Sequence, residues 1–213
     1  DRVTTAQLFA DRLLPLLKDE YGFDTIVLEA VPSDQPSSEI EYYMVHGVAD
    51  DEHTPFLSRN LQLLKGKSAA DLLYVIKRCG ELGISVRGGG PSLQDIIGGD
   101  MPSLNFEIRD QSIMAIKRAL RFTDRVMWYG GLIHNDIDDG QELSIAPALS
   151  STYNFVELDL IVPYGGDGRL YDYIDYVSAE ELSTYPGDND LVCIMVNPNS
   201  YVFVYPPAVF EGF

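Results

Sequence analysis

The 213-residue sequence predicts an α+β fold in which several helices pack on a mixed, mostly antiparallel sheet. Three observations lead to this prediction. Apolar residues at helical spacing alternate along the chain with short apolar runs of strand length. The predicted strands 25–31 and 40–48 are separated only by a polar loop, so we expect them to pair antiparallel. The runs 191–196 and 201–205 flank Asn-Pro-Asn-Ser, which is typical of a β-hairpin with a four-residue loop.

The chain begins with an amphipathic helix that opens at Thr4 or Thr5 and ends near Tyr21. Pro15 lies in its interior and predicts a kink or a restart, because proline lacks a backbone N–H. After the two strands, residues 55–64 are predicted to form a short helix that leads into the centre of the chain.

The central stretch combines a helix, a tight turn, a strand and a glycine-rich loop. Ser68 is placed to cap the helix, and Gly83 is placed to end it in the left-handed conformation that glycine tolerates. Residues 84–86 are predicted to form a short buried strand. The triglycine segment 88–90 follows, and Ser92 can cap the next short helix.

The second half of the chain gives less regular signals. Apolar and polar residues alternate over 104–109, which predicts a half-buried strand. Asp110 is placed to cap a helix over 111–123, whereas the periodicity of 125–134 fits a helix and a strand equally well. Residues 153–162 are predicted to form a further strand.

Charge is the strongest property of the whole sequence, with a net value of −18. Phosphate binding needs a basic surface, so we expect no general affinity for nucleic acid. Residues 1–125 hold 14 basic and 19 acidic residues, a net charge of −5, whereas 126–213 hold one basic and 14 acidic residues, a net charge of −13. This polarity either solubilises the chain or lets the acidic end of one molecule meet the basic end of another. We expect a single domain over 1–213, within which 135–213 is a candidate acidic subdomain.

The sequence also bears on the cellular compartment. No apolar run is long enough to span a bilayer, and Asp11 and Arg12 interrupt an amino-terminal stretch that does not resemble a signal peptide. Cys79 and Cys193 do not make a disulfide framework, so we expect a soluble protein in a reducing, intracellular compartment. The sequence begins without methionine, which leaves open whether an upstream segment was removed.

The glycine-rich loop is the first candidate site. A strand followed by glycines and a helix start can present backbone N–H groups to an anion such as a phosphate, with a basic side chain beside them. The residues of this candidate site are Arg87, Gly88, Gly89, Gly90 and Ser92. The alternative is a tight turn that needs positive φ, because the segment fits neither the dinucleotide fingerprint nor the P-loop.

Other patterns predict no metal, no cofactor and no catalytic residue. His46, His134 and the acidic loop 50–53 offer imidazole and carboxylate groups, but their spacing matches no zinc motif. Residues 136–142 resemble a calcium loop, but Ile137 stands where an acidic residue is required. There is no Gly-x-Ser-x-Gly nucleophile motif, and both cysteines lie in apolar contexts, where thiols are inert.

Two fragments resemble a known protein family. Residues 115–131 (AIKRALRFTDRVMWYGG) are similar to a helix and glycine segment of tailed-bacteriophage major capsid proteins, and residues 191–203 (LVCIMVNPNSYVF) are similar to a strand of their axial domain. Together the fragments cover 30 of 213 residues, and the basic extended loop and arm of that family are not evident. The resemblance implies assembly into a virion, and a neck or tail-terminator protein would suit the order of elements as well.

Three functional hypotheses follow. The leading one is a non-enzymatic structural protein that self-associates or binds other virion proteins, in a phage particle or the host cytoplasm, through a head-to-tail contact. The predicted contact residues are Arg118, Arg121 and Arg125 on one side and Asp136, Asp138 and Asp139 on the other. The second hypothesis is a small enzyme or ligand-binding module that uses the glycine-rich loop for a phosphate-bearing ligand. The third is an acidic inhibitor or decoy that covers a basic surface of a partner.

Overall fold

The computed structural model describes residues 5–64, 66–130, 142–161, 192–197 and 200–204. Its helices are α1 (Thr5–Leu8), the π-helical turn η1 (Phe9–Leu13), α2 (Leu14–Asp19), α3 (Ser37–His46), α4 (Pro55–Leu64), α5 (Gly66–Glu81), α6 (Leu93–Gly98), α7 (Met101–Ala119) and α8 (Ala146–Ser150). Its strands are β1 (Thr25–Pro32), β2 (Ser85–Gly90), β3 (Val126–Tyr129), β4 (Glu157–Ile161), β5 (Val192–Asn197) and β6 (Ser200–Val204).

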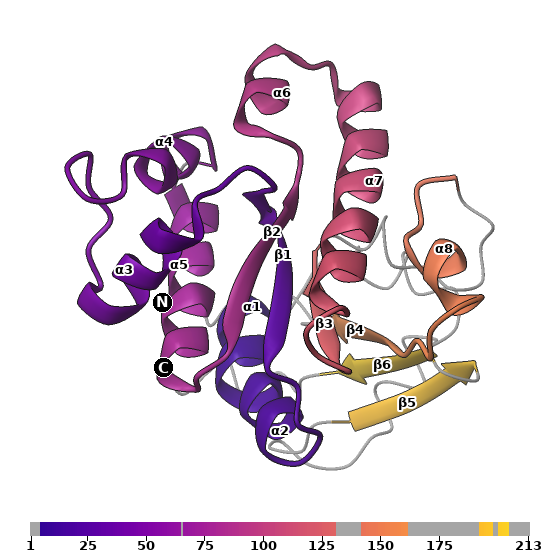
Figure 1. Ribbon diagram of the computed structural model, residues 1–213. Coiled ribbons are helices and arrows are strands. Elements are labelled where there is room, and N and C mark those ends of the chain that lie inside the picture. Colours follow the sequence, from indigo (N-terminus) through magenta and orange to yellow (C-terminus); the bar gives the residue numbers. More distant parts are fainter. Residues whose placement is uncertain (1–4, 65, 131–141, 162–191, 198–199, 205–213) are drawn as a thin grey trace, which may run out of the picture.

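The main sheet has the strand order β2-β1-β3, and both pairings are parallel. Ile26 in β1 lies opposite Val86 in β2 and Met127 in β3. The connection from β1 to β2 runs through α3, α4 and α5 on one face of the sheet, and the connection from β2 to β3 runs through α6 and α7 on the other (Figure 1). Crossovers between parallel strands are right-handed, so two crossovers in opposite directions place their helices on opposite faces.

The prediction of a mostly antiparallel α+β sheet is therefore wrong: the main sheet is parallel and the arrangement is α/β-like. The main cause is the segment 40–48, which the sequence predicts to be an antiparallel partner of 25–31 but which lies mostly in α3. A short apolar run has no decisive period. Burial follows helical spacing, because Ile40 and Tyr43 are buried whereas Val45 is 77% exposed.

A second predicted strand, 104–109, lies inside α7. The helix starts earlier than Asp110, because the side chain of Asp100 accepts a hydrogen bond from Ser103 N, with an O···N distance of 2.9 Å. Such a cap satisfies a backbone donor at a helix start and so stabilises a helix that begins at this point. The alternation of apolar and polar residues over 104–109 is too short to prevent it. Residues 104–119 then continue as a single helix. Of the ambiguous segment 125–134, residues 126–129 form the strand β3, and residues 131–134 lie outside the described residues.

Several local signals are confirmed. Gly83 has a φ of +65° two residues after the end of α5, and Ser92 caps α6 by accepting a hydrogen bond from Asp95 N. Pro15 lies in the first turn of α2, where the first predicted helix restarts after η1. Ser68 is not a cap, because α5 already begins at Gly66.

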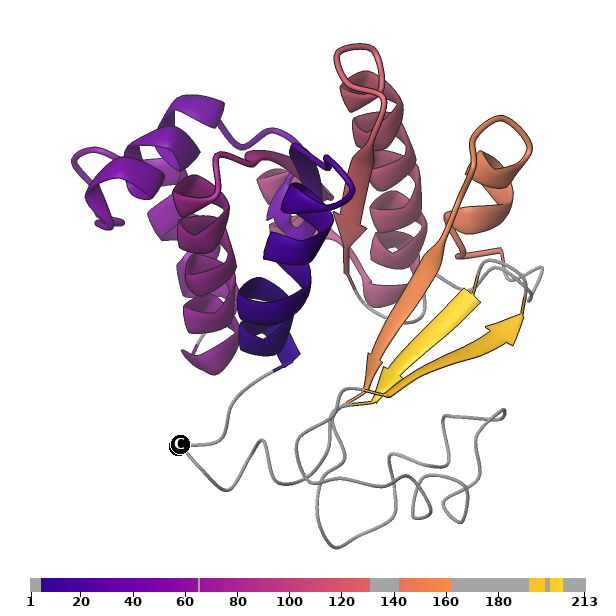
Figure 2. The same cartoon turned by 90° about the horizontal axis from the view of Figure 1, so that it is seen from below.

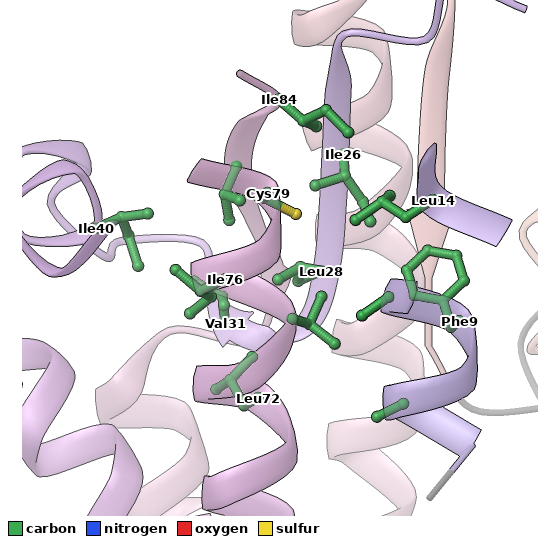
Figure 3. Close-up of a cluster of buried hydrophobic side chains, with 14 of the residues drawn as sticks. Phe9, Leu14, Ile26, Leu28, Val31, Ile40, Leu72, Ile76, Cys79 and Ile84 are labelled. Atoms are coloured by element: carbon green, nitrogen blue, oxygen red, sulfur yellow. The ribbon is translucent and has the colours of Figure 1, made fainter. Parts of the chain in front are cut away.

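The first core cluster lies between β1 and the helices that precede and follow it. Ile26 and Leu28 point from β1 toward α5, whose buried face presents Ile76 and Cys79 among others, while Phe9 covers the same side from η1 (Figure 3). Each buried aliphatic side chain of this kind contributes about 1.5–3 kcal/mol relative to an exposed one.

The second core cluster lies on the opposite face of β1. Val27 packs there against Ala115 and Ile116 of α7, and against Ile145 and Leu149 at α8. Figure 2 shows α7 and α8 on one side of the sheet and α5 with α1 and α2 on the other. Strand β1 is thus apolar on both faces, which is typical of a central strand in a parallel sheet.

A smaller sheet has the order β4-β6-β5. Strands β5 and β6 pair antiparallel, with Cys193 opposite Phe203, which confirms the predicted carboxyl-terminal hairpin. The predicted four-residue loop is wrong, because Asn197 and Ser200 pair with each other and leave only residues 198 and 199 between the strands. Strand β4 pairs parallel with β6 and is shorter than the predicted 153–162. Its Leu158 contacts the first core cluster and so joins the smaller sheet to the rest of the molecule.

Within the described ranges, none of the helices has the length and apolar content that crossing a bilayer would require.

Candidate functional site

The carboxyl ends of β1, β2 and β3 meet at one edge of the main sheet, because the three strands are parallel. This carboxyl edge lies at the top of Figure 1, where β2 leads into α6. The chain leaves β1 toward one face of the sheet and leaves β2 toward the other. In open α/β sheets, ligands bind outside the carboxyl ends of the strands, at the point where connections diverge in this way. The carboxyl edge is therefore the candidate functional site.

Glu29 is the charged side chain that β1 places at this edge. It follows the four buried residues 25–28, at the point where the pairing of β1 with β2 begins to shift register between Leu28 and Pro32. A Cβ added to Gly130, the residue that follows β3, would overlap both Oε2 of Glu29 and the ring of Trp128. The carboxylate of Glu29 therefore lies directly against the exposed backbone at the end of β3.

A buried hydroxyl, that of Ser112, holds the ring of Trp128 at the candidate site. Ser112 on α7 is fully buried, and its Oγ donates a hydrogen bond to the carbonyl oxygen of Gly89, with an O···O distance of 2.8 Å. The same Oγ accepts a hydrogen bond from Nε1 of Trp128, with an N···O distance of 3.0 Å. This chain of two bonds links β2, α7 and β3, and it holds the indole ring beside Gly130.

The last residues of β1 and the residue that follows it are held in place by two further hydrogen bonds. Asn60 on α4 is 1% exposed, and its Nδ2 donates to the carbonyl oxygen of Ala30, with an N···O distance of 3.1 Å. Ser33 N donates to the carbonyl oxygen of Gly90, with an N···O distance of 3.0 Å. Buried amides left without partners cost free energy, so these bonds fix the backbone just after Glu29 to α4 and to the end of β2.

The triglycine of the predicted anion site belongs to β2 and not to a loop. Gly88, Gly89 and Gly90 lie along β1, and none of them has positive φ. A Cβ at Gly88 or Gly90 would overlap carbonyl oxygens of β1, so these glycines allow a close approach of two backbones. Arg87 lies opposite Val27 in the sheet register and is exposed.

Ser92, the last residue of the predicted anion site, lies among carboxylates. Its Oγ caps α6 at Asp95 N and also hydrogen-bonds to the carboxylate of Asp95. Oδ1 of Asp34 accepts a hydrogen bond from Leu93 N, with an O···N distance of 3.1 Å. The protein's own carboxylates therefore occupy the start of α6, and this disfavours a further anion there. Phosphate binding by residues 87–92 stays a prediction.

The predicted contact residues lie at the other end of the molecule. Arg118 belongs to the last turn of α7, Arg121 follows it, and Arg125 directly precedes β3; all three are exposed. Asp136, Asp138 and Asp139 lie outside the described residues.

The predicted loop around residues 50–53 has a structural role. Asp50 accepts hydrogen bonds from the backbone amides of Glu52 and His53, and the bond from His53 is the main reason that the pKa of Asp50 lies below its ordinary value. His46 and His53 both contact the ring of Tyr42, with centroid distances of 4.3 and 4.8 Å. In the part of the chain that the structure describes, no group of three or more His, Cys, Asp or Glu residues is arranged to hold a metal ion.

Comparisons with protein-family models, with curated proteins and with solved structures found no match to this chain. The resemblance of residues 115–131 and 191–203 to phage capsid proteins therefore stays a prediction.

Proposed function

We propose that this chain is a ligand-binding α/β domain, as a binding module or an enzyme, whose ligand contacts the carboxyl edge at Glu29 and Gly130. The strand order β2-β1-β3, with crossovers on opposite faces, is the observation that carries this proposal. Open parallel sheets bind ligands where their connections diverge. The geometry thus favours the general class of the second hypothesis, a ligand-binding module or small enzyme, over self-assembly as the main function. It differs from that hypothesis in the place of the site and in the kind of ligand.

The charges at the carboxyl edge favour a ligand that donates hydrogen bonds. Glu29 offers carboxylate oxygens beside Gly130, and Asp34 and Asp95 add two carboxylates beyond β2, whereas Arg87 is the cation of the same stretch. Hydroxyl and ammonium groups donate to carboxylates, and a phosphate is repelled by them. The proposed ligand is therefore a neutral or cationic small molecule with hydroxyl or amine groups.

Amide chemical-shift mapping tests this proposal with two sets of compounds, polyols and amines in the first, nucleotides and sugar phosphates in the second. We expect compounds of the first set to shift the amides of Ala30, Gly90 and Gly130. The variant Glu29→Gln keeps the shape of the side chain but removes its charge, so it should bind these compounds about tenfold more weakly.

Glu41→Gln is the matched control, because Glu41 is an exposed carboxylate on α3, away from the carboxyl edge. It should bind like the wild type. Shifts centred elsewhere, or equal binding by both variants, would contradict the proposal. A response to sugar phosphates alone, centred on residues 87–92, would favour the phosphate site predicted from the sequence.

A further inference from the structure

The carboxyl-terminal end of α7 and the turn after it form a basic surface with an exposed aromatic ring. We call this surface the α7 basic end; it consists of Lys117, Arg118, Arg121, Phe122 and Arg125. It lies at the amino edge of the main sheet, at the bottom of Figure 1, opposite the proposed ligand site. An inference about it is therefore independent of the proposed function.

The exposure of Phe122 is the first observation. Its side chain is 85% exposed, the highest value among the large apolar residues that the structure describes. Met114, one helical turn before Arg118, is 44% exposed on the outer side of α7. Burying a Phe side chain contributes about 1.5–3 kcal/mol, so the ring at Phe122 is available to stabilise a contact with a partner.

The charge of this end is the second observation. Residues 117–125 hold four basic residues and one acidic residue, a net charge of +3 in a chain of −18. All four cations are exposed, and none forms an ion pair with another described residue. They are therefore available to a partner of opposite charge.

The third observation is that the turn is fixed to the rest of the fold. Oγ1 of Thr123 donates a hydrogen bond to Oδ1 of Asp24, just before β1, with an O···O distance of 2.8 Å. This bond is the main cause that lowers the pKa of Asp24. A surface that is already ordered loses little conformational entropy when it binds a partner.

We infer that the α7 basic end is a contact surface for a second copy of this chain, which meets it with acidic surface. The supporting argument is charge complementarity: the chain as a whole is at −18, and residues 126–213 alone are at −13. The basic end and an acidic surface are different surfaces, so the contact is heterologous and continues into a ring or a filament. Single-stranded nucleic acid is the competing occupant, but the net charge of the chain opposes it.

Sedimentation of the full chain at three salt concentrations tests the inference. At about 0.02 M salt, the long-range repulsion between two acidic chains opposes association. At about 0.1 M this repulsion is largely screened, whereas ion pairs in direct contact are screened less. We expect the strongest association near 0.1 M and about tenfold weaker association near 0.5 M.

Two double variants separate the local contact from the net charge. Arg118→Glu with Arg121→Glu should weaken association at least about tenfold, and Phe122→Ser should weaken it as well. The control is Arg59→Glu with Lys77→Glu, which makes the same change in charge at exposed positions on α4 and α5 and should weaken association far less. Circular dichroism checks that each variant is folded. The inference is overturned if the wild type is monomeric at every salt concentration, or if the two double variants weaken association equally. It is also overturned if the wild type binds a single-stranded oligonucleotide and the double variant of Arg118 and Arg121 does not.

Discussion

Cys79 is fully buried on α5 in the first core cluster, and burial raises the pKa of its thiol from 9.0 to about 12. The thiol therefore has a higher pKa in the folded protein than in the unfolded chain. Below pH 9 it is protonated in both states, and the stability of the fold is at its full value. As the pH rises from 9 toward 12 only the unfolded chain loses this proton, so the free energy of unfolding falls. We expect the free energy of unfolding to fall by about 1 kcal/mol more in the wild type than in Cys79→Ala between pH 9 and 10.

Urea unfolding at pH 8, 9 and 10 measures this effect. Val75→Ala is the control, because Val75 is 1% exposed on the same helix and its replacement removes apolar atoms but no titrating group. The pH dependence of Val75→Ala should parallel that of the wild type. If Cys79→Ala also runs parallel to the wild type, the prediction fails.

Two residues that matter to the candidate site carry little signal in the sequence. Glu29 lies inside the apolar run 26–31 and resembles any polar position of a strand, until the strand order shows that it lies beside Gly130. Ser112 resembles a surface serine on a helix, yet it bonds to Gly89 and Trp128, which lie 23 and 16 residues away in the sequence. Contacts over such separations depend on tertiary packing, and single-sequence periodicity does not contain them.

At the scale of the element, the glycines of β2 give the next prediction. A Cβ at Gly90 would overlap the carbonyl oxygen of Glu29 on β1, so Gly90→Ala should force the two strands apart and cost about 2 kcal/mol of unfolding free energy. A Cβ at Gly98, at the end of α6, would meet no atom within 4 Å, so Gly98→Ala should be neutral or stabilise by up to about 1 kcal/mol.

Urea denaturation of the two variants, followed by the fluorescence of the single tryptophan, Trp128, measures both effects. The comparison distinguishes a close approach of backbones from a general intolerance of alanine. Equal stability of the two variants would show that β2 does not need glycine for its contact with β1.

The elements predicted correctly have signals that act locally. Gly83 ends α5 in the left-handed conformation, and the carboxyl-terminal hairpin pairs strands that are adjacent in sequence. The errors at 40–48 and 104–109 have a different origin. Both segments contain apolar residues that fit a strand over a few residues, but they fold as parts of longer helices whose caps and packing faces decide the outcome.

At the scale of the whole molecule, the net charge of −18 predicts the response to salt. Like charges repel more strongly in the compact state than in the expanded chain, and salt screens this repulsion. The urea midpoint should therefore rise between about 0.01 and 0.2 M sodium chloride. A variant that neutralises three exposed acids, Asp19→Asn, Glu20→Gln and Glu41→Gln, should start from a higher midpoint and respond less to salt. A midpoint that is constant or falls with salt in the wild type would contradict this prediction.

The sequence by itself determined the net charge and its uneven distribution, the helix α5 with its glycine end, the cap of α6 and the hairpin of β5 and β6. Each of these follows from residue type or from neighbours along the chain. Only the tertiary structure decided that β1, β2 and β3 are parallel in the order β2-β1-β3, because parallel pairing joins segments separated by whole helices and leaves no turn signal between them. That order brings Glu29 beside Gly130 at the carboxyl edge, and it places the α7 basic end at the opposite edge.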